Sequence, residues 1–238
     1  LDDFTIADSC KYVGDYAFSN CTIKELTIPK SVIYFGDNAF YGASIEKVFY
    51  EGTALEWCNI DFFAQIHYVE VYLEENYPSY SNPLCAGADL YINGELLTEM
   101  VFPEGTTKIN DAVFHGYSKL TKVVLPDTIN EIMDWAFMGC DALKSITIPN
   151  QVTKIGKYAF HGCSSIKEIT IPEMISHIGK DAFTNCSSLT SITILNPTPP
   201  LIESDSFDIK EINVPKESLT KYKRSKIWKK IAKYTPID

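Results

Sequence analysis

Short runs of alternating apolar and polar residues recur along the chain at a nearly constant interval. Four phenylalanines, from Phe114 to Phe183, follow one another at intervals of 23 residues, and so do four prolines, from Pro103 to Pro172. Aligned on these marks, the chain reads I-x-x-I-x-I-P-x-x-V-x-x-I-G-x-x-A-F-x-x-C-x-x-L. Self-similarity at such a period is typical of a repeat protein in which each copy is one structural unit.

Each copy begins with a short apolar–polar–apolar element, and this period of two indicates a β-strand. A proline follows most copies and ends the strand, because it has no N–H to donate to a sheet. One strand per repeat, with a return path of about 18 residues, can only stack in parallel as a solenoid. The expected strands lie at 4–6, 26–28, 48–50, 69–71, 100–102, 123–125, 146–148, 169–171, 192–194 and 212–214.

The repeat also predicts which side chains form the core. In the copy that spans 146–166, the apolar positions should point inward, namely Ile146, Ile148, Val152, Ile155, Ala159, Phe160, Cys163 and Ile166. Glycines occupy one position of the repeat in several copies, and we interpret this as a turn with positive φ. These glycines are Gly14, Gly36, Gly156 and Gly179.

Cysteine and histidine lie close together in YAFHGCSSI (158–166), a pattern that could belong to a metal site or a thiol nucleophile. The cysteine position, however, holds Ala43 in another copy, so it is a packing position in which we expect buried thiols. His115 and His161 share a position of varied residue types, which predicts exposure. We therefore expect no catalytic, cofactor-binding or metal-binding residue. The cysteines of this column are Cys21, Cys140, Cys163 and Cys186.

The repeat resembles the BspA-like leucine-rich repeats, a bacterial branch of the leucine-rich repeat superfamily. Copies such as LKSITIPNQVTKIGKYAFHGC (143–163) are close to its consensus, and VPKESLTKYKRSKIW (214–228) is similar to its C-terminal cap. The resemblance implies an α/β-type repeat fold, a right-handed β-solenoid that is mostly strand and loop. It also implies an exported or surface-attached protein of a host-associated bacterium. Some members are adhesins for host matrix proteins, and the pattern supplies no catalytic residues.

Two segments depart from the regular repeat. We expect a solenoid of about ten coils over 1–214, with irregular coils and a hairpin insertion within 51–98. Asn93-Gly94 between apolar pairs predicts a type I′ hairpin turn, which either bridges two repeat registers or forms a flap that contacts a ligand. Residues 215–238 form the expected helical cap, with Ser218 as its N-cap and apolar residues from Leu219 to Ile231 on one face.

Charge is distributed unevenly along the chain. Residues 1–209 carry a formal charge of −16 and residues 210–238 carry +6. The acidic body argues against a nucleic-acid partner. No run of 18 apolar residues occurs, so we expect no membrane insertion, and the N-terminus lacks a signal-peptide pattern. The basic cap is either solvated or binds an anionic surface. We expect an extracellular or cell-surface monomer whose signal peptide is not part of these residues.

Outward-facing strand residues are the candidates for ligand binding. One stretch mixes aromatic, aliphatic and charged side chains of both signs, as a protein interface does. We interpret it as a non-catalytic recognition or adhesion surface for a protein ligand on the concave sheet. A glycan ligand and a passive spacer are alternatives, and an enzyme acting on polysaccharides is the least favoured. The candidate residues are Lys47, Phe49, Tyr68, Glu70, Glu99, Val101 and Lys122.

Overall fold

The computed structural model describes residues 2–62, 80–203, 211–231 and 233–238. The chain forms a β-solenoid in which short strands stack on one another. It divides into two compact units. The first unit contains residues 1–97 and 110–117, and the second contains 98–109 and 118–238. Within the described residues, no helix has the length and apolar character needed to cross a membrane.

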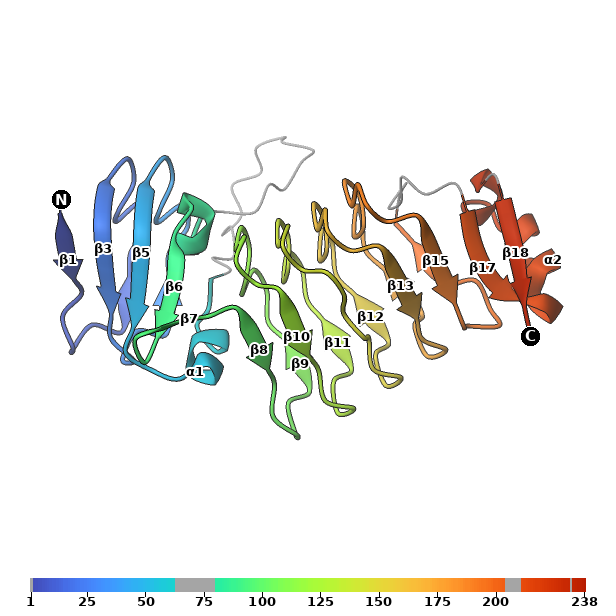
Figure 1. The fold of residues 1–238 in the computed structure, drawn as a ribbon, viewed down its shortest axis with the longest axis horizontal. Coiled ribbons are helices and arrows are strands. Elements are labelled where there is room, and N and C mark those ends of the chain that lie inside the picture. The colour runs from blue at the N-terminus through green and yellow to red at the C-terminus, as the bar shows by residue number, and fades with distance from the viewer. Residues whose placement is uncertain (1, 63–79, 204–210, 232) are drawn as a thin grey trace. The chain divides into compact units, whose positions relative to one another are not determined.

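The first unit is built on a five-stranded sheet in the order β1-β3-β5-β6-β7 (Figure 1). All its strands pair in parallel except β7, which forms an antiparallel hairpin with β6. A second, two-stranded sheet is parallel, and two short helices complete the unit. The elements are β1 (Asp3–Thr5), β2 (Tyr12–Val13), β3 (Thr22–Ile28), β4 (Tyr34–Phe35), β5 (Ser44–Tyr50), α1 (Ala54–Cys58), η1 (Pro83–Ala86), β6 (Asp89–Ile92) and β7 (Glu95–Leu96).

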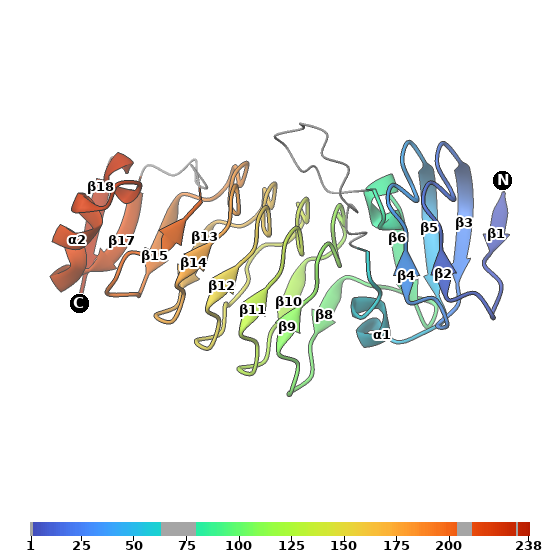
Figure 2. The same ribbon diagram turned by 180° about the vertical axis from the view of Figure 1, so that it is seen from behind.

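The second unit repeats the same stacking over more coils. Figure 2 shows β9, β11, β12 and β14 as successive rungs, and all strand pairs of this unit are parallel. Its three sheets have the orders β10-β8, β16-β14-β12-β11-β9 and β13-β15-β17-β18. The strands are β8 (Glu99–Val101), β9 (Lys108–Ile109), β10 (Lys122–Val124), β11 (Glu131–Ile132), β12 (Lys154–Ile155), β13 (Glu168–Ile171), β14 (His177–Ile178), β15 (Ser191–Ile194), β16 (Leu201–Ile202), β17 (Glu211–Pro215) and β18 (Lys233–Ile237).

Identical side chains stack inside both units, as the repeat predicts. Phe160 lies between Phe137 and Phe183, with ring centroids 5.4 and 5.3 Å away. In the first unit, Phe18 and Phe40 stack at 5.3 Å. All eight residues of the copy 146–166 that were predicted to point inward are buried. This confirms the core prediction, although residues 146–148 do not form a regular strand.

The strand predicted from sequence to pair with β5 was the wrong one. Residues 69–71 were expected there, but the two sides of β5 are taken by β3 and β6, with Val48 opposite Leu90. The segment 69–71 itself lies outside the described residues. The Asn93-Gly94 hairpin is confirmed, because both residues have positive φ (53° and 78°) and join β6 to β7. Its first strand is a rung of the main sheet.

The explanation for the glycine column was also wrong. None of Gly14, Gly36, Gly156 and Gly179 has a positive φ. Three of them lie where a Cβ would clash with the preceding coil, for example 2.4 Å from Asp15 Oδ1 at Gly36. The left-handed conformation instead occurs two residues later, at non-glycine residues. These are Tyr16, Asn38, Ala112, Trp135, Tyr158 and Asp181.

The C-terminal segment combines short helices with a final strand. Helix α2 (Leu219–Arg224) follows η2 (Lys216–Ser218) and precedes η3 (Trp228–Lys230). Ser218 occupies the expected N-cap position, but its side chain makes no capping hydrogen bond. Tyr222 and Trp228 are buried in edge-to-face contact, and β18 then pairs in parallel with β17. The helix is thus shorter than expected, because the last residues extend the sheet.

Candidate binding surface

The outward face of the main sheet in the first unit carries two rows of side chains. Alternation along each strand buries Leu26, Val48 and Leu90 and turns their neighbours outward. One row consists of Asp3, Glu25, Lys47 and Asp89, which are register partners on β1, β3, β5 and β6. The other row consists of Thr5, Thr27, Phe49 and Tyr91, and the hairpin adds Leu96 opposite Tyr91.

Phe49 and Tyr91 form an aromatic platform on this face. Their ring centroids are 5.0 Å apart and their planes differ by 29°, so the rings stack. Both side chains are half-buried, while Leu96 beside them is 37% exposed. Such a pair contributes about 0.5–1.5 kcal/mol beyond area burial. We call Phe49, Tyr91 and Leu96 the Phe49–Tyr91 platform; it presents apolar surface that the core does not use.

A charged pair borders the platform. Lys47 Nζ lies 2.8 Å from Glu25 Oε1, and both side chains are about 40% exposed. The hydrogen bond and the charge of Glu25 raise the pKa of Lys47 above its ordinary value, so the ammonium stays charged. An ion pair this exposed contributes little to stability. Its effect on the site is to fix a cation and an anion next to the aromatic rings, as in the polar rim of an interface.

The candidate residues predicted from sequence fall into separate parts of the chain. Lys47 and Phe49 lie in the first unit, and Tyr68 and Glu70 lie outside the described residues. The remaining three lie in the second unit. There, Lys122 Nζ is 3.4 Å from Glu99 Oε2, and Val101, which is 63% exposed, lies opposite Val124.

Sequence reasoning missed Tyr91, the partner of Phe49. The signal was present in Asp89–Ile92, which has the same alternation as the other strands and is followed by a hairpin turn. We interpreted this segment as an insertion, and therefore left its outward residue out of the strand column.

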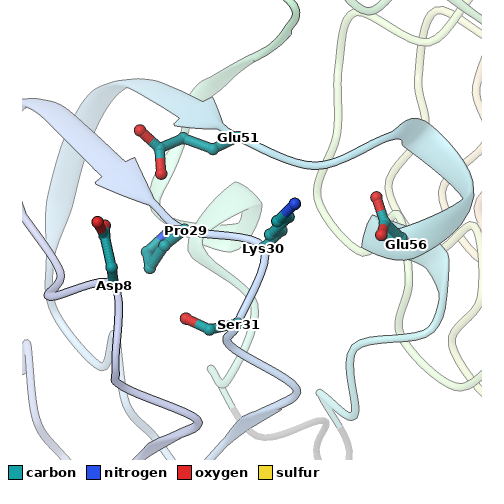
Figure 3. Close-up of a pocket in the computed structure, with 6 residues that line it drawn as sticks. All are labelled: Asp8, Pro29, Lys30, Ser31, Glu51 and Glu56. Atoms are coloured by element: carbon teal, nitrogen blue, oxygen red, sulfur yellow. The ribbon is translucent and has the colours of Figure 1, made fainter.

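An open depression of about 580 Å³ lies at the ends of β3 and β5 (Figure 3). Figure 3 shows Lys30 among the acidic side chains. The Glu56 carboxylate accepts a hydrogen bond from the Thr53 N–H at 2.8 Å and closes a capping box at the start of α1. These bonds to Thr53 lower the pKa of Glu56, which makes it a poor proton donor. The lining residues are Asp8, Pro29, Lys30, Ser31, Glu51 and Glu56.

The second unit has a charged depression of about 410 Å³ on the sheet that contains β12 and β14. His177 Nε2 lies 3.1 Å from Glu203 Oε1, and Lys157 Nζ lies 3.9 Å from Glu203 Oε2. The Asp134 carboxylate accepts a hydrogen bond from the Lys157 N–H at 2.8 Å. The Glu203 carboxylate is thus engaged by both His177 and Lys157.

The cysteine column is a packing column, as predicted, except that Cys21 in the first unit is only partly buried. Cys140, Cys163 and Cys186 are buried, and the Cys163 thiol donates to the Phe137 carbonyl at 3.1 Å. All seven cysteines are thiols. Burial raises the pKa of Cys163 well above its ordinary value, which keeps it neutral and unreactive.

His161 is only partly exposed, and the prediction of an exposed His115 was wrong. Its side chain is only 8% exposed, and Nδ1 lies 2.9 Å from Cys85 Sγ. Burial raises the pKa of the Cys85 thiol far above its ordinary value, so this thiol–imidazole pair lacks the thiolate that a nucleophile needs. Among the described residues, no three His, Cys, Asp or Glu side chains form a group that could hold a metal ion.

Comparison with known protein families matches the BspA type leucine rich repeat region to residues 1–91 and 86–213. The chain belongs to the BspA-type leucine-rich repeat family. The two matched ranges include every strand from β1 to β16, and the 23-residue spacing is therefore the BspA-type repeat. Comparison with the curated proteins gave no match.

Several solved structures resemble this BspA-type chain. The pneumococcal vaccine antigen PcpA matches all of it and 68% of its own chain, with 19% identity and a TM-score of 0.59. A leucine rich cell surface protein from Faecalibacterium prausnitzii matches 91% of it, with 20% identity and a TM-score of 0.45, over 82% of its own chain. A leucine-rich repeat protein from Eubacterium ventriosum matches 99%, with 19% identity and a TM-score of 0.47, over 66% of its own chain. The similarity to PcpA shows the fold.

Proposed function

We propose that this BspA-type protein is a non-catalytic recognition module that binds a protein ligand through the outward face of its parallel sheets. The observation that carries the proposal is the stacked Phe49–Tyr91 platform beside the Lys47–Glu25 ion pair. Aromatic anchors with a polar rim are what protein interfaces use for affinity and specificity. The platform lies on the face that the fold does not need for its core.

The proposal extends to the other outward residues of the same kind. Lys47 belongs to the rim in the first unit, and Glu99, Val101 and Lys122 provide charged and aliphatic contacts in the second. Tyr68 and Glu70 remain predictions from sequence. We further propose that the protein acts outside the cell, on the bacterial surface or as a secreted protein, where host matrix proteins are the ligand class. Family membership and the structural relative described as a cell surface protein support this location.

A glycan ligand is the second candidate, and the same platform favours it. Stacked aromatic rings on an open surface can pack against a sugar ring as well as against apolar side chains. The two candidates differ in what must surround the rings: a sugar needs several hydrogen-bonding partners, whereas a protein side chain needs apolar contact. Leu96 and the paired charges beside the platform favour the protein.

Binding assays with a matched pair of variants test the proposal. Immobilised protein is probed with a panel of matrix proteins (fibronectin, laminin and collagens) and with a glycan array. The double variant Phe49→Ala/Tyr91→Ala should raise the dissociation constant by about 30-fold or more, because binding loses a central anchor. The control variant Thr147→Ala/Thr170→Ala changes exposed positions of the second unit and should bind like wild type. Equal binding by both double variants would show that the platform is not the binding site. Binding to glycans but to no protein would favour a glycan as the ligand instead.

A further inference from the structure

A second outward face of the first unit carries two tyrosines, of which Tyr12 is exposed and Tyr34 is partly buried. Tyr12 on β2 and Tyr34 on β4 are register partners, and Asp61 continues the column by bridging to Tyr34. The two rings lie 6.3 Å apart, and Tyr12 is 67% exposed. Their neighbours Val13, Phe35 and Phe62 are buried and supply the core at this level. The core of the coil is thus formed by these neighbours and does not depend on the tyrosine rings.

Carboxylates surround this tyrosine pair. Asp15 accepts a hydrogen bond from the Asp37 N–H at 2.8 Å, which fixes its side chain at the turn after β2. Partial burial raises the pKa of Tyr34, and the negative charges of Asp15, Asp61 and Asp37 raise it further. Asp61 is the bridge partner of Tyr34, and Asp15 and Asp37 lie two residues after β2 and β4, respectively. We call Tyr12, Tyr34, Asp15, Asp37 and Asp61 the Tyr–Asp face.

The repeat itself does not require these residue types. The corresponding sheet of the second unit presents lysine, glutamate, histidine and leucine at the tyrosine positions. At the turn, the second unit has Asp134, Lys157 and Lys180 at the position that Asp15 and Asp37 occupy in the first unit. The fold therefore accepts either charge here. The register partners that replace the tyrosines are Lys108, Glu131, Lys154, His177 and Leu201.

We propose that the Tyr–Asp face is a docking surface for a lysine- and arginine-rich segment of a partner protein. Aromatic rings attract ammonium and guanidinium groups over their faces, and carboxylates pair with the same groups. Charge complementarity thus selects a cationic partner, and the open, flat sheet suits an extended chain. This surface is separate from the Phe49–Tyr91 platform, so it does not depend on the function proposed for that platform.

Peptide binding with charge-matched variants tests this proposal. The probe is a fluorescein-labelled repeat of arginine, lysine and serine, and its control carries glutamine at each basic position. Tyr12→Ala and the double variant Asp15→Asn/Asp37→Asn should each weaken binding about five- to tenfold. The double variant Asp8→Asn/Glu51→Gln removes the same charge at the depression of Figure 3 and should bind like wild type. Melting curves of all variants establish that they remain folded.

Three results would overturn the proposal. One is equal weakening by both charge-removing variants, since binding would then depend only on net charge. Another is equal affinity for the glutamine peptide. The third is self-association of the protein in sedimentation velocity that disappears when Lys223 and Arg224 are changed to glutamate. That result would assign the face to the basic C-terminal segment of a second copy.

Discussion

Gly36 lies against Asp15 of the preceding coil so closely that a Cβ at Gly36 would be 2.4 Å from Asp15 Oδ1 and 2.5 Å from Asp15 N. The same repeat position in the preceding coil is Gly14, where an added Cβ would meet no atom outside the adjacent residues within 4 Å. The two glycines of one column therefore differ in what surrounds them: a side chain at Gly14 would have space, whereas at Gly36 the preceding coil occupies that space.

Replacing each of these two glycines by alanine should change the free energy of unfolding differently. Gly36→Ala should lower the free energy of unfolding by about 1–3 kcal/mol, because backbone atoms of the neighbouring coil cannot move aside. Gly14→Ala should leave it unchanged or raise it by up to about 1 kcal/mol, since alanine restricts the unfolded chain. Urea unfolding curves measure both. Equal effects at the two positions would contradict the close-approach explanation.

Tyr117 occupies the cysteine column in the first unit, and its hydroxyl donates to the Leu97 carbonyl at 2.6 Å. Tyr117→Phe should destabilise the protein by about 1–2 kcal/mol, because the partly buried Leu97 carbonyl loses its hydrogen-bond donor. Tyr41→Phe is the control at an exposed ring and should change stability by less than about 0.5 kcal/mol. Chemical denaturation provides the comparison, and an unchanged midpoint for Tyr117→Phe would argue against this bond.

The cysteines should titrate in two groups. Burial keeps the thiols of Cys58, Cys85 and Cys163 protonated, because it raises their pKa far above the ordinary value. In native protein, Ellman's reagent should react first with the partly exposed Cys10 and Cys21. Cys85 is also partly exposed, but its raised pKa should make it slow, and the four buried thiols should react slowest. After unfolding, all seven should react. Recovery of fewer thiols would indicate disulfides and contradict the packing column.

Acid should weaken the attachment of the last strand. Glu211 on β17 lies 2.7 Å from Lys233 Nζ and accepts a hydrogen bond from Thr235 at 2.8 Å. The bond with Lys233, followed by that with Thr235, lowers the pKa of Glu211 below 4.5 in the folded protein. The folded state therefore favours the ionised carboxylate. This contribution is present above about pH 4.5 and is lost as the pH falls further.

Glu211→Gln tests this linkage. The variant should be less stable than wild type at pH 6, and the difference should shrink as the pH falls below 4.5. Glu168→Gln, in the same outward row on β13, should show no such convergence. Urea midpoints measured from pH 6 to pH 3 decide the matter. A difference that stays constant with pH would show that the Glu211 carboxylate does not stabilise β18.

The inward columns could be predicted from sequence because a residue such as Phe160 repeats at a fixed period, and only stacking gives that period a physical meaning. The strand that pairs with β5 could not be predicted from sequence. Asp89–Ile92 and 69–71 carry the same short alternation, and pairing is decided by contacts far apart in the chain. Because 69–71 was chosen as the neighbouring strand, Tyr91 was not identified as the partner of Phe49.

Other differences arise from interactions that leave no pattern along the chain. The burial of His115 depends on η1, which brings Cys85 against it. The need for glycine at Gly36 depends on the adjacent coil. In the C-terminal segment, the apolar spacing around Tyr222 fitted a longer helix, but the chain gains a full row of backbone pairing by ending as β18.

Site-specific photo-crosslinking tests the central claim most directly. Thr27 lies beside Phe49 in the outward row, so a photoreactive amino acid placed there should crosslink to a bound protein ligand. The same group at Thr170, on β13 of the second unit, serves as the comparison. We predict a ligand adduct at position 27 that disappears in the Phe49→Ala/Tyr91→Ala background. A ligand that binds with full affinity but gives no adduct at position 27 would contradict the account.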